Sequence, residues 1–108
     1  MTVSTWQESC CVFVALAGEV DMANSPQLGA WLSDQAQKKH LVVDCTDLAF
    51  IDSSGLKALL EAKAAFQGQV ALCAGGSQLE RLLEITGLEE LLLTFDTLDE
   101  ARSYFHGI

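Results

Sequence analysis

The chain has 108 residues, half of them hydrophobic, a single proline and a formal net charge of −9. This length and composition exclude a disordered chain and predict one compact domain over residues 1–108. The six basic residues form no cluster larger than the pair Lys38-Lys39, so no nucleic-acid-binding surface is expected, and an anionic membrane would repel the domain. The acidic balance favours a partner with a basic face, or it serves solubility alone.

The thiols and imidazoles lack the spacing of a metal site. No Cys-x-x-Cys is present, and the two histidines, His40 and His106, are far apart, so we expect no metal and no cofactor. Both histidines are predicted to be solvated. The cysteines are expected to be buried, reduced thiols: Cys10, Cys11, Cys45 and Cys73. Without a signal peptide or an apolar stretch of about 20 residues, the expected location is the cytoplasm, without membrane insertion.

The first third of the chain predicts two strands and a helix. Residues 2–6 form a weak strand, and the apolar run 10–18 predicts a strand buried on both faces, with Glu8-Ser9 as the hairpin turn between them. A helix begins at Ser25-Pro26, because serine caps a helix and proline suits its first turn. Its apolar stripe ends near Lys38-Lys39 and consists of Leu28, Trp31, Leu32 and Ala36.

The middle third predicts a strand, a connector and a second helix. Residues 41–43 form a short strand that ends at Asp44, and residues 45–51 form the connector. The helix opens at Asp52-Ser53-Ser54-Gly55 and stops at Gly68. Its inner stripe is Leu56, Leu59, Leu60, Lys63 and Phe66, with Lys63 extending its charge to solvent.

The last third predicts two strand–helix pairs. Residues 70–74 form a strand that turns at Gly75-Gly76. A capping box at Ser77-x-x-Glu80 opens a third helix that ends at Gly87. Residues 91–95 form the last strand, and a second capping box at Thr97-x-x-Glu100 opens the final helix. The residues expected to face inward are Leu79, Leu82, Leu83 and Thr86 in the third helix and Leu98, Ala101 and Phe105 in the last.

This order of elements predicts an α/β fold. An N-terminal hairpin followed by alternating strands and helices gives a mixed β-sheet with parallel crossovers, covered by about four α-helices. Ligands and partners of such sheets meet the loops beyond the carboxyl ends of the strands. The segment Asp52-Ser53-Ser54-Gly55 follows a predicted strand and opens a helix, so it lies in that region.

The Asp-Ser-Ser-Gly segment has two interpretations. In the simpler one it is a helix cap, because aspartate and serine accept hydrogen bonds from the unpaired N–H groups of the first turn. In the other, a serine hydroxyl is displayed for phosphorylation where the helix dipole stabilises the anionic product, and Gly55 leaves room for another protein. A phosphate adds about −1.5 to −2 charges. It would stabilise the helix start by about 0.3–2 kcal/mol but weaken a fitted interface on the order of a thousandfold.

Three stretches of the chain carry a family pattern. Residues 16–21 read Leu-Ala-Gly-Glu-Val-Asp and precede Asn24-Ser25-Pro26. Residues 42–56 run from Val-Val-Asp through Phe-Ile-Asp-Ser-Ser-Gly-Leu, and residues 82–101 contain Thr-Gly-Leu and Phe-x-x-Leu-x-Glu-Ala. Together these stretches resemble the STAS domain family, and within it the single-domain bacterial anti-sigma factor antagonists.

The resemblance implies a regulatory cycle. Ser53 falls on the position phosphorylated by an anti-sigma factor that is also an ATP-dependent serine kinase, whereas Ser54 falls on a neighbouring serine that is not the acceptor. The unphosphorylated form binds the anti-sigma factor and frees a sigma factor for transcription, and a metal-dependent serine phosphatase restores it. The partner surface would comprise Asp21, Asn24, Asp52, Ser53, Ser54, Gly55, Leu56 and Lys57.

Two positions in this surface have other interpretations. Asp21 could instead be a loop-capping carboxylate. Lys57 departs from the family pattern, because a glycine or another small residue often follows the leucine in sporulation-type antagonists. Its ammonium could instead pair with Glu61 four residues later.

Two other functions compete with the antagonist. Small STAS proteins also serve as accessory subunits of bacterial lipid-transport ABC complexes, where the serine need not be phosphorylated. An enzyme would need Cys45 or Ser53 as nucleophile with a histidine as base. Because the sequence contains no G-x-S-x-G elbow, phosphate-binding loop or metal-ligand set, we expect a regulator and not an enzyme.

Overall fold

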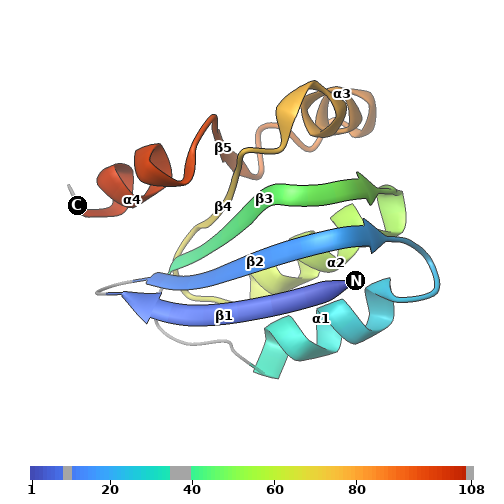
Figure 1. The fold of residues 1–108 in the computed structure, drawn as a ribbon, viewed down its shortest axis with the longest axis horizontal. Helices are drawn as coiled ribbons and strands as arrows, with labels where there is room; N and C mark the ends of the chain where they lie inside the picture. The colour runs from blue at the N-terminus through green and yellow to red at the C-terminus, as the bar shows by residue number, and fades with distance from the viewer. Residues whose placement is uncertain (9–10, 35–39, 107–108) are drawn as a thin grey trace.

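A computed structural model describes residues 1–8, 11–34 and 40–106 of the chain (Figure 1). The elements are β1 (Thr2–Glu8), β2 (Cys11–Val20), α1 (Ser25–Asp34), β3 (His40–Ile51), α2 (Ser53–Ala65), β4 (Val70–Cys73), α3 (Gly76–Thr86), β5 (Leu93–Phe95) and α4 (Leu98–His106). The sheet has the strand order β1-β2-β3-β4-β5, with β1 antiparallel to β2 and the other pairs parallel. The predicted mixed sheet with an N-terminal hairpin is confirmed.

The sheet is covered on both faces. Side chains of β2 alternate between two cores, because successive residues of a strand point to opposite faces. Val12 and Val14 join a larger core with Leu28 of α1 and Leu59 of α2. Phe13 joins a smaller core with α4. This explains why β2 is an almost uninterrupted apolar run.

Strand β3 is longer than predicted. Residues 45–51 were expected to form a connector, yet β3 continues to Ile51 and stays paired with β2 as far as Val20. The register shifts between Ala15 and Ala17 and between Gly18 and Glu19, which marks bulges or irregularities in the pairing. These shifts obscure the two-residue alternation by which a strand is recognised, so the prediction of a connector was wrong.

The predicted helix ends are met in part. Gly87 ends α3 in the left-handed conformation, with φ at +71°, as expected. The predicted capping box of α3 is wrong, because α3 begins at Gly76 and makes no side-chain cap bond. Helix α2 ends at Ala65, three residues before Gly68. The predicted end of the first helix lies outside the described residues, and so does Ser9 of the predicted Glu8-Ser9 turn. Glu8 itself is not in a turn, because it is the last residue of β1 and pairs with Cys11.

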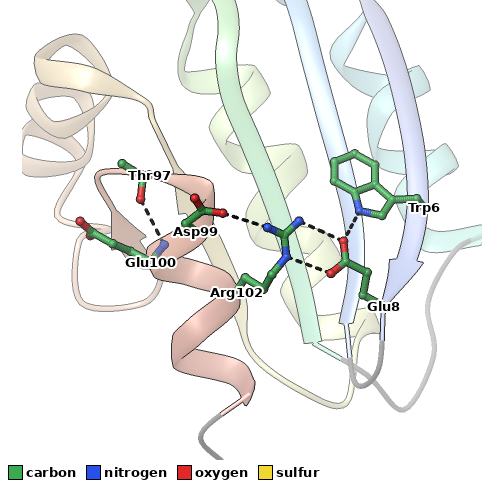
Figure 2. A network of polar contacts seen from close by, with 6 residues as sticks. All are labelled: Trp6, Glu8, Thr97, Asp99, Glu100 and Arg102. Atoms are coloured by element: carbon green, nitrogen blue, oxygen red, sulfur yellow. Dashed lines mark hydrogen bonds and ion pairs between the residues drawn. The ribbon is translucent and has the colours of Figure 1, made fainter.

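Helix α4 is held against the sheet by polar contacts (Figure 2) in addition to its apolar packing in the smaller core. Thr97 Oγ1 accepts the backbone N–H of Glu100 at 3.1 Å, which confirms one half of that capping box. The guanidinium of Arg102 donates to both carboxylate oxygens of Glu8 at 2.9 and 3.0 Å and lies 5.5 Å from the centre of the Phe13 ring. The indole N–H of Trp6 donates to the same carboxylate at 2.7 Å.

His40 is not a free surface residue, contrary to expectation. Its ring stacks on Phe105 with the centroids 4.5 Å apart, and its Nδ1 accepts the backbone N–H of Gln69 at 2.9 Å. These contacts join the start of β3 to α4 and to the loop before β4. His106, at the end of α4, is exposed as predicted.

Candidate functional site

The segment between β3 and α2 is held at three points. The backbone N–H of Asp52 donates to Val20 O at 3.1 Å, which ties the end of β3 to the end of β2. The Asp52 carboxylate accepts the N–H of Gly55 at 3.0 Å and so caps α2. The N–H of Leu56 donates to Asp52 O at 3.1 Å. The first turn of α2 is therefore a fixed platform.

Two of the predicted contact residues lie inside this platform. Gly55 is buried, and a Cβ atom there would stand 2.7 Å from Cγ1 of both Ile51 and Val20. Leu56 has no exposed surface. Glycine is therefore required here by packing within the chain, and not to make room for a partner as expected. Gly55 and the Leu56 side chain are therefore packed inside the domain and are not presented at the surface.

The two serines face different sides of α2. Ser53 is exposed and lines a groove between the start of α2 and helix α3. Ser54 is half-buried and lines a separate groove toward α1, together with Lys57 and Met22. Helix-capping patterns do not separate these neighbours, whereas the family resemblance points to Ser53, and in the structure Ser53 is the more exposed of the two residues.

The groove beside Ser53 is apolar and open. It has a volume of about 500 Å³ and is lined by Phe50, Ile51, Asp52, Ser53, Gln78, Arg81, Leu82, Ile85 and Thr86. Phe50 is 41% exposed and Ile85 is 74% exposed, although both are large hydrophobic residues. Clustered apolar side chains on a surface mark interaction sites. Sequence reasoning missed Phe50, Arg81 and Ile85, because Ile85 lies off the inner stripe of α3 and Phe50 was placed in a connector.

Asp21 and Asn24 organise the loop between β2 and α1. Asp21 Oδ1 accepts the N–H groups of Ala23 at 3.0 Å and Asn24 at 3.2 Å. Asn24 Oδ1 accepts the N–H of Asp21 at 2.9 Å, and its Nδ2 donates to Glu19 O at 2.9 Å. The loop-capping interpretation of Asp21 is therefore correct. The loop directly follows Val20, the residue that holds Asp52, so it lies beside the platform.

Lys57 is exposed on the side of α2 that faces α1. Glu61 lines the same groove, but the two residues form no ion pair within 4.0 Å. The alternative of a Lys57–Glu61 pair is therefore not realised. Lys57 remains a charge available at the surface one turn from Ser53.

Burial makes the Cys45 and Cys73 thiols poor nucleophiles. Cys11, Cys45 and Cys73 are buried thiols, as predicted, while Cys10 lies outside the described residues. Burial raises the pKa of both Cys45 and Cys73 to about 12, so each remains a neutral thiol at neutral pH. Within residues 1–8, 11–34 and 40–106, no group of three or more His, Cys, Asp or Glu side chains could hold a metal ion. No helix in these ranges is long and apolar enough to cross a membrane.

Comparison with known proteins agrees with this architecture. The STAS domain model matches residues 3–101, and the chain therefore belongs to the STAS domain family. It is 29% identical over 91 residues to an anti-sigma F factor antagonist from Paenibacillus polymyxa, covering 79% of this chain and 78% of the relative. It is 30% identical over 84 residues to an anti-sigma-B factor antagonist from Listeria monocytogenes, covering 73% of this chain and 74% of the relative.

A solved structure shows the same fold. The crystal structure of an anti-sigma factor antagonist from Mycobacterium paratuberculosis superposes with a TM-score of 0.82. The match covers 95% of this chain and 92% of that one at 23% identity. At this identity the likeness establishes the arrangement of the sheet and helices.

Proposed function

We propose that this protein is an anti-sigma factor antagonist whose activity is switched by phosphorylation of Ser53. In its unphosphorylated form it binds an anti-sigma factor and so releases a sigma factor for transcription. The observation that carries the proposal is the exposed Ser53 hydroxyl on a capped helix start, at the rim of an apolar groove that contains Phe50 and Ile85. The names of the two sequence relatives support the same role.

The proposed partners act on one atom, Ser53 Oγ. The anti-sigma factor would also be a serine kinase that transfers the γ-phosphoryl group of ATP to this oxygen. An O–P bond forms as the bond to ADP breaks, and the hydroxyl proton passes to the kinase or to water. A serine phosphatase would hydrolyse the phosphoserine and restore the hydroxyl. The protein itself would be a regulator in the cytoplasm and would catalyse neither step.

The docking surface would combine the platform and the groove. An apolar segment of the anti-sigma factor would cover Phe50, Leu82 and Ile85, with Ser53 at the edge of the contact. The added charge would be buried against that partner, where desolvation and like-charge repulsion weaken binding by two to three orders of magnitude. In the free domain the same charge lies at the positive end of the α2 dipole, so the fold is retained.

The test uses recombinant serine-kinase anti-sigma factors encoded in the source genome. Binding to wild type, Ser53→Ala, Ser53→Asp and Ser54→Asp is measured by calorimetry, and the phosphate is mapped by mass spectrometry. We expect Ser53→Ala to bind without being phosphorylated and Ser53→Asp to lose most of its affinity. Ser54→Asp adds the same charge toward the other groove and should bind more tightly than Ser53→Asp. Phosphate on Ser54 only, or equal binding by all four proteins, would refute the switch.

A second pair of variants tests the groove. Ile85→Asp places a charge in the groove, whereas Leu91→Asp places one at another exposed apolar residue that does not line it. We expect Ile85→Asp to weaken binding at least tenfold and Leu91→Asp to have little effect. Equal affinities would show that the partner docks elsewhere.

A further inference from the structure

We propose that Arg81 is the intramolecular counter-ion of phosphorylated Ser53. The inference rests on the proposed phosphorylation and adds a consequence of it: the phosphate and the guanidinium would form an ion pair across the groove between α2 and α3. The modification would then close the docking surface as well as change its charge.

Arg81 and Ser53 come from different helices but line the same groove. Ser53 is the first residue of α2, and Arg81 lies on α3 beside Gln78, Leu82 and Ile85. Both residues are exposed, so their side chains can reorient toward one another. Before phosphorylation, Arg81 forms no ion pair within 4.0 Å with the acidic residues that the structure describes. Its charge is therefore available to a new anion.

The other described cations are placed less well for this role. Arg102 is engaged by Glu8 and Asp99 near α4. Lys57 lines the groove toward α1, on the other side of α2 from Ser53. Lys63 lies nearly two turns beyond Lys57 along α2 and so is still farther from Ser53. Of the basic residues in the described ranges, Arg81 is the one that lines the groove with Ser53.

The chemistry of the groove favours this pairing. A guanidinium presents a planar fork of donors that matches two phosphate oxygens, which an ammonium does not. Ser53 and Arg81 are both exposed at this open groove, so the attraction would have the modest strength of a surface ion pair. Asp52 is the other charged group that lines the groove. Its carboxylate repels the phosphate and increases the need for a cation.

The pair would link two elements that flank an open surface. A bridge from Ser53 to Arg81 would pass over the mouth of the groove and hinder access to Leu82 and Ile85. A partner that docks on these side chains would have to break the bridge first. Phosphorylation would thus lower affinity by occlusion in addition to repulsion.

The experiment needs no kinase. Phosphoserine is incorporated at position 53 during translation in the full chain, and the second phosphate pKa is measured by phosphorus NMR titration. The proteins compared are the wild type, Arg81→Gln and Lys57→Gln, which each remove one charge from an exposed side chain. Thermal unfolding of the unphosphorylated variants verifies that all are folded.

Loss of the counter-ion should make the dianion harder to form. We expect the phosphate pKa, ordinarily about 6, to be about 0.2–0.7 unit higher in Arg81→Gln than in wild type, with a smaller change in Lys57→Gln. Equal values in wild type and Arg81→Gln, or an equal shift in Lys57→Gln, would overturn the pairing. Either result leaves the proposed function standing, whereas failure of a kinase to modify Ser53 refutes the switch without altering this measurement.

Discussion

The carboxylate of Asp52 and the backbone N–H of Gly55 are joined by a hydrogen bond of 3.0 Å that closes the first turn of α2. The same aspartate donates its own N–H to Val20 O, so this one residue joins the end of β3 to the start of α2. Because Asp52 precedes Ser53, these two hydrogen bonds hold the backbone of the proposed switch in place whether or not a partner contacts Asp52 itself.

Loss of this cap should destabilise the domain. Asp52→Ala removes the acceptor for the Gly55 N–H and is expected to lower the free energy of unfolding by about 1 kcal/mol. Asp52→Asn retains an acceptor oxygen and should be close to wild type. Urea unfolding followed by circular dichroism measures both. Equal stability of the alanine and asparagine variants would contradict a capping role.

Gly55 should not tolerate a methyl group. In Gly55→Ala the new Cβ would stand 2.7 Å from stiff β-branched side chains, Ile51 and Val20, and overpacking of this kind costs about 1–3 kcal/mol. Gly29→Ala in α1 is the matched control, because its new Cβ would meet the Cβ of Ala58 in α2 at an ordinary 3.7 Å. We expect Gly29→Ala to be stabilising by up to about 1 kcal/mol. Equal effects of the two substitutions in urea unfolding would refute this account.

The Glu8–Arg102 ion pair should make stability depend on acid pH (Figure 2). Hydrogen bonds from Arg102 and Trp6 hold the pKa of the Glu8 carboxyl below its ordinary value of 4.5. The stabilisation is therefore complete above the unfolded-state value near 4.5 and is lost as the pH falls through the lower pKa of the folded state.

The control for this prediction removes the titrating group. Unfolding midpoints of wild type and Glu8→Gln are compared between pH 7 and pH 3. We expect the difference between them to shrink below about pH 4.5, because the wild-type carboxylate becomes protonated. Asp99→Asn removes the more exposed of the two carboxylates that contact Arg102 and leaves the Glu8 contact intact. This variant should follow the wild-type profile more closely than Glu8→Gln does. A pH-independent gap between wild type and Glu8→Gln would show that the ion pair does not titrate as described.

The buried thiols should be unreactive until the chain unfolds. In a Cys10→Ser background the remaining thiols are Cys11, Cys45 and Cys73, all buried. With the pKa of Cys45 and Cys73 raised to about 12, modification by iodoacetamide at pH 8 is expected to be slow in buffer and complete in urea. Mass spectrometry counts the adducts. Rapid labelling of Cys45 or Cys73 in the native protein would show that the site opens readily.

The strands buried on both faces were predictable because their composition alone identifies them. Residues 11–14 and 70–73 are continuous apolar runs, and the glycine at position 87 marks a helix end that needs a left-handed residue. The extension of β3 was not predictable, because the irregular pairing of β2 and β3 breaks the alternation. Nor was the start of α3, where the serine and glutamate of a capping box are present but the helix begins before them.

The sequence by itself determined the mixed sheet, because local patterns of apolar and capping residues fix the order of its elements, and its family motifs indicated both the family and the candidate serine. Tertiary structure alone decided which serine is exposed, that Gly55 faces Val20 and Ile51, and that Ser53 shares a groove with Arg81 and Ile85. These relationships join residues of different elements. They depend on how α2 and α3 pack on the sheet, and no local pattern encodes that geometry.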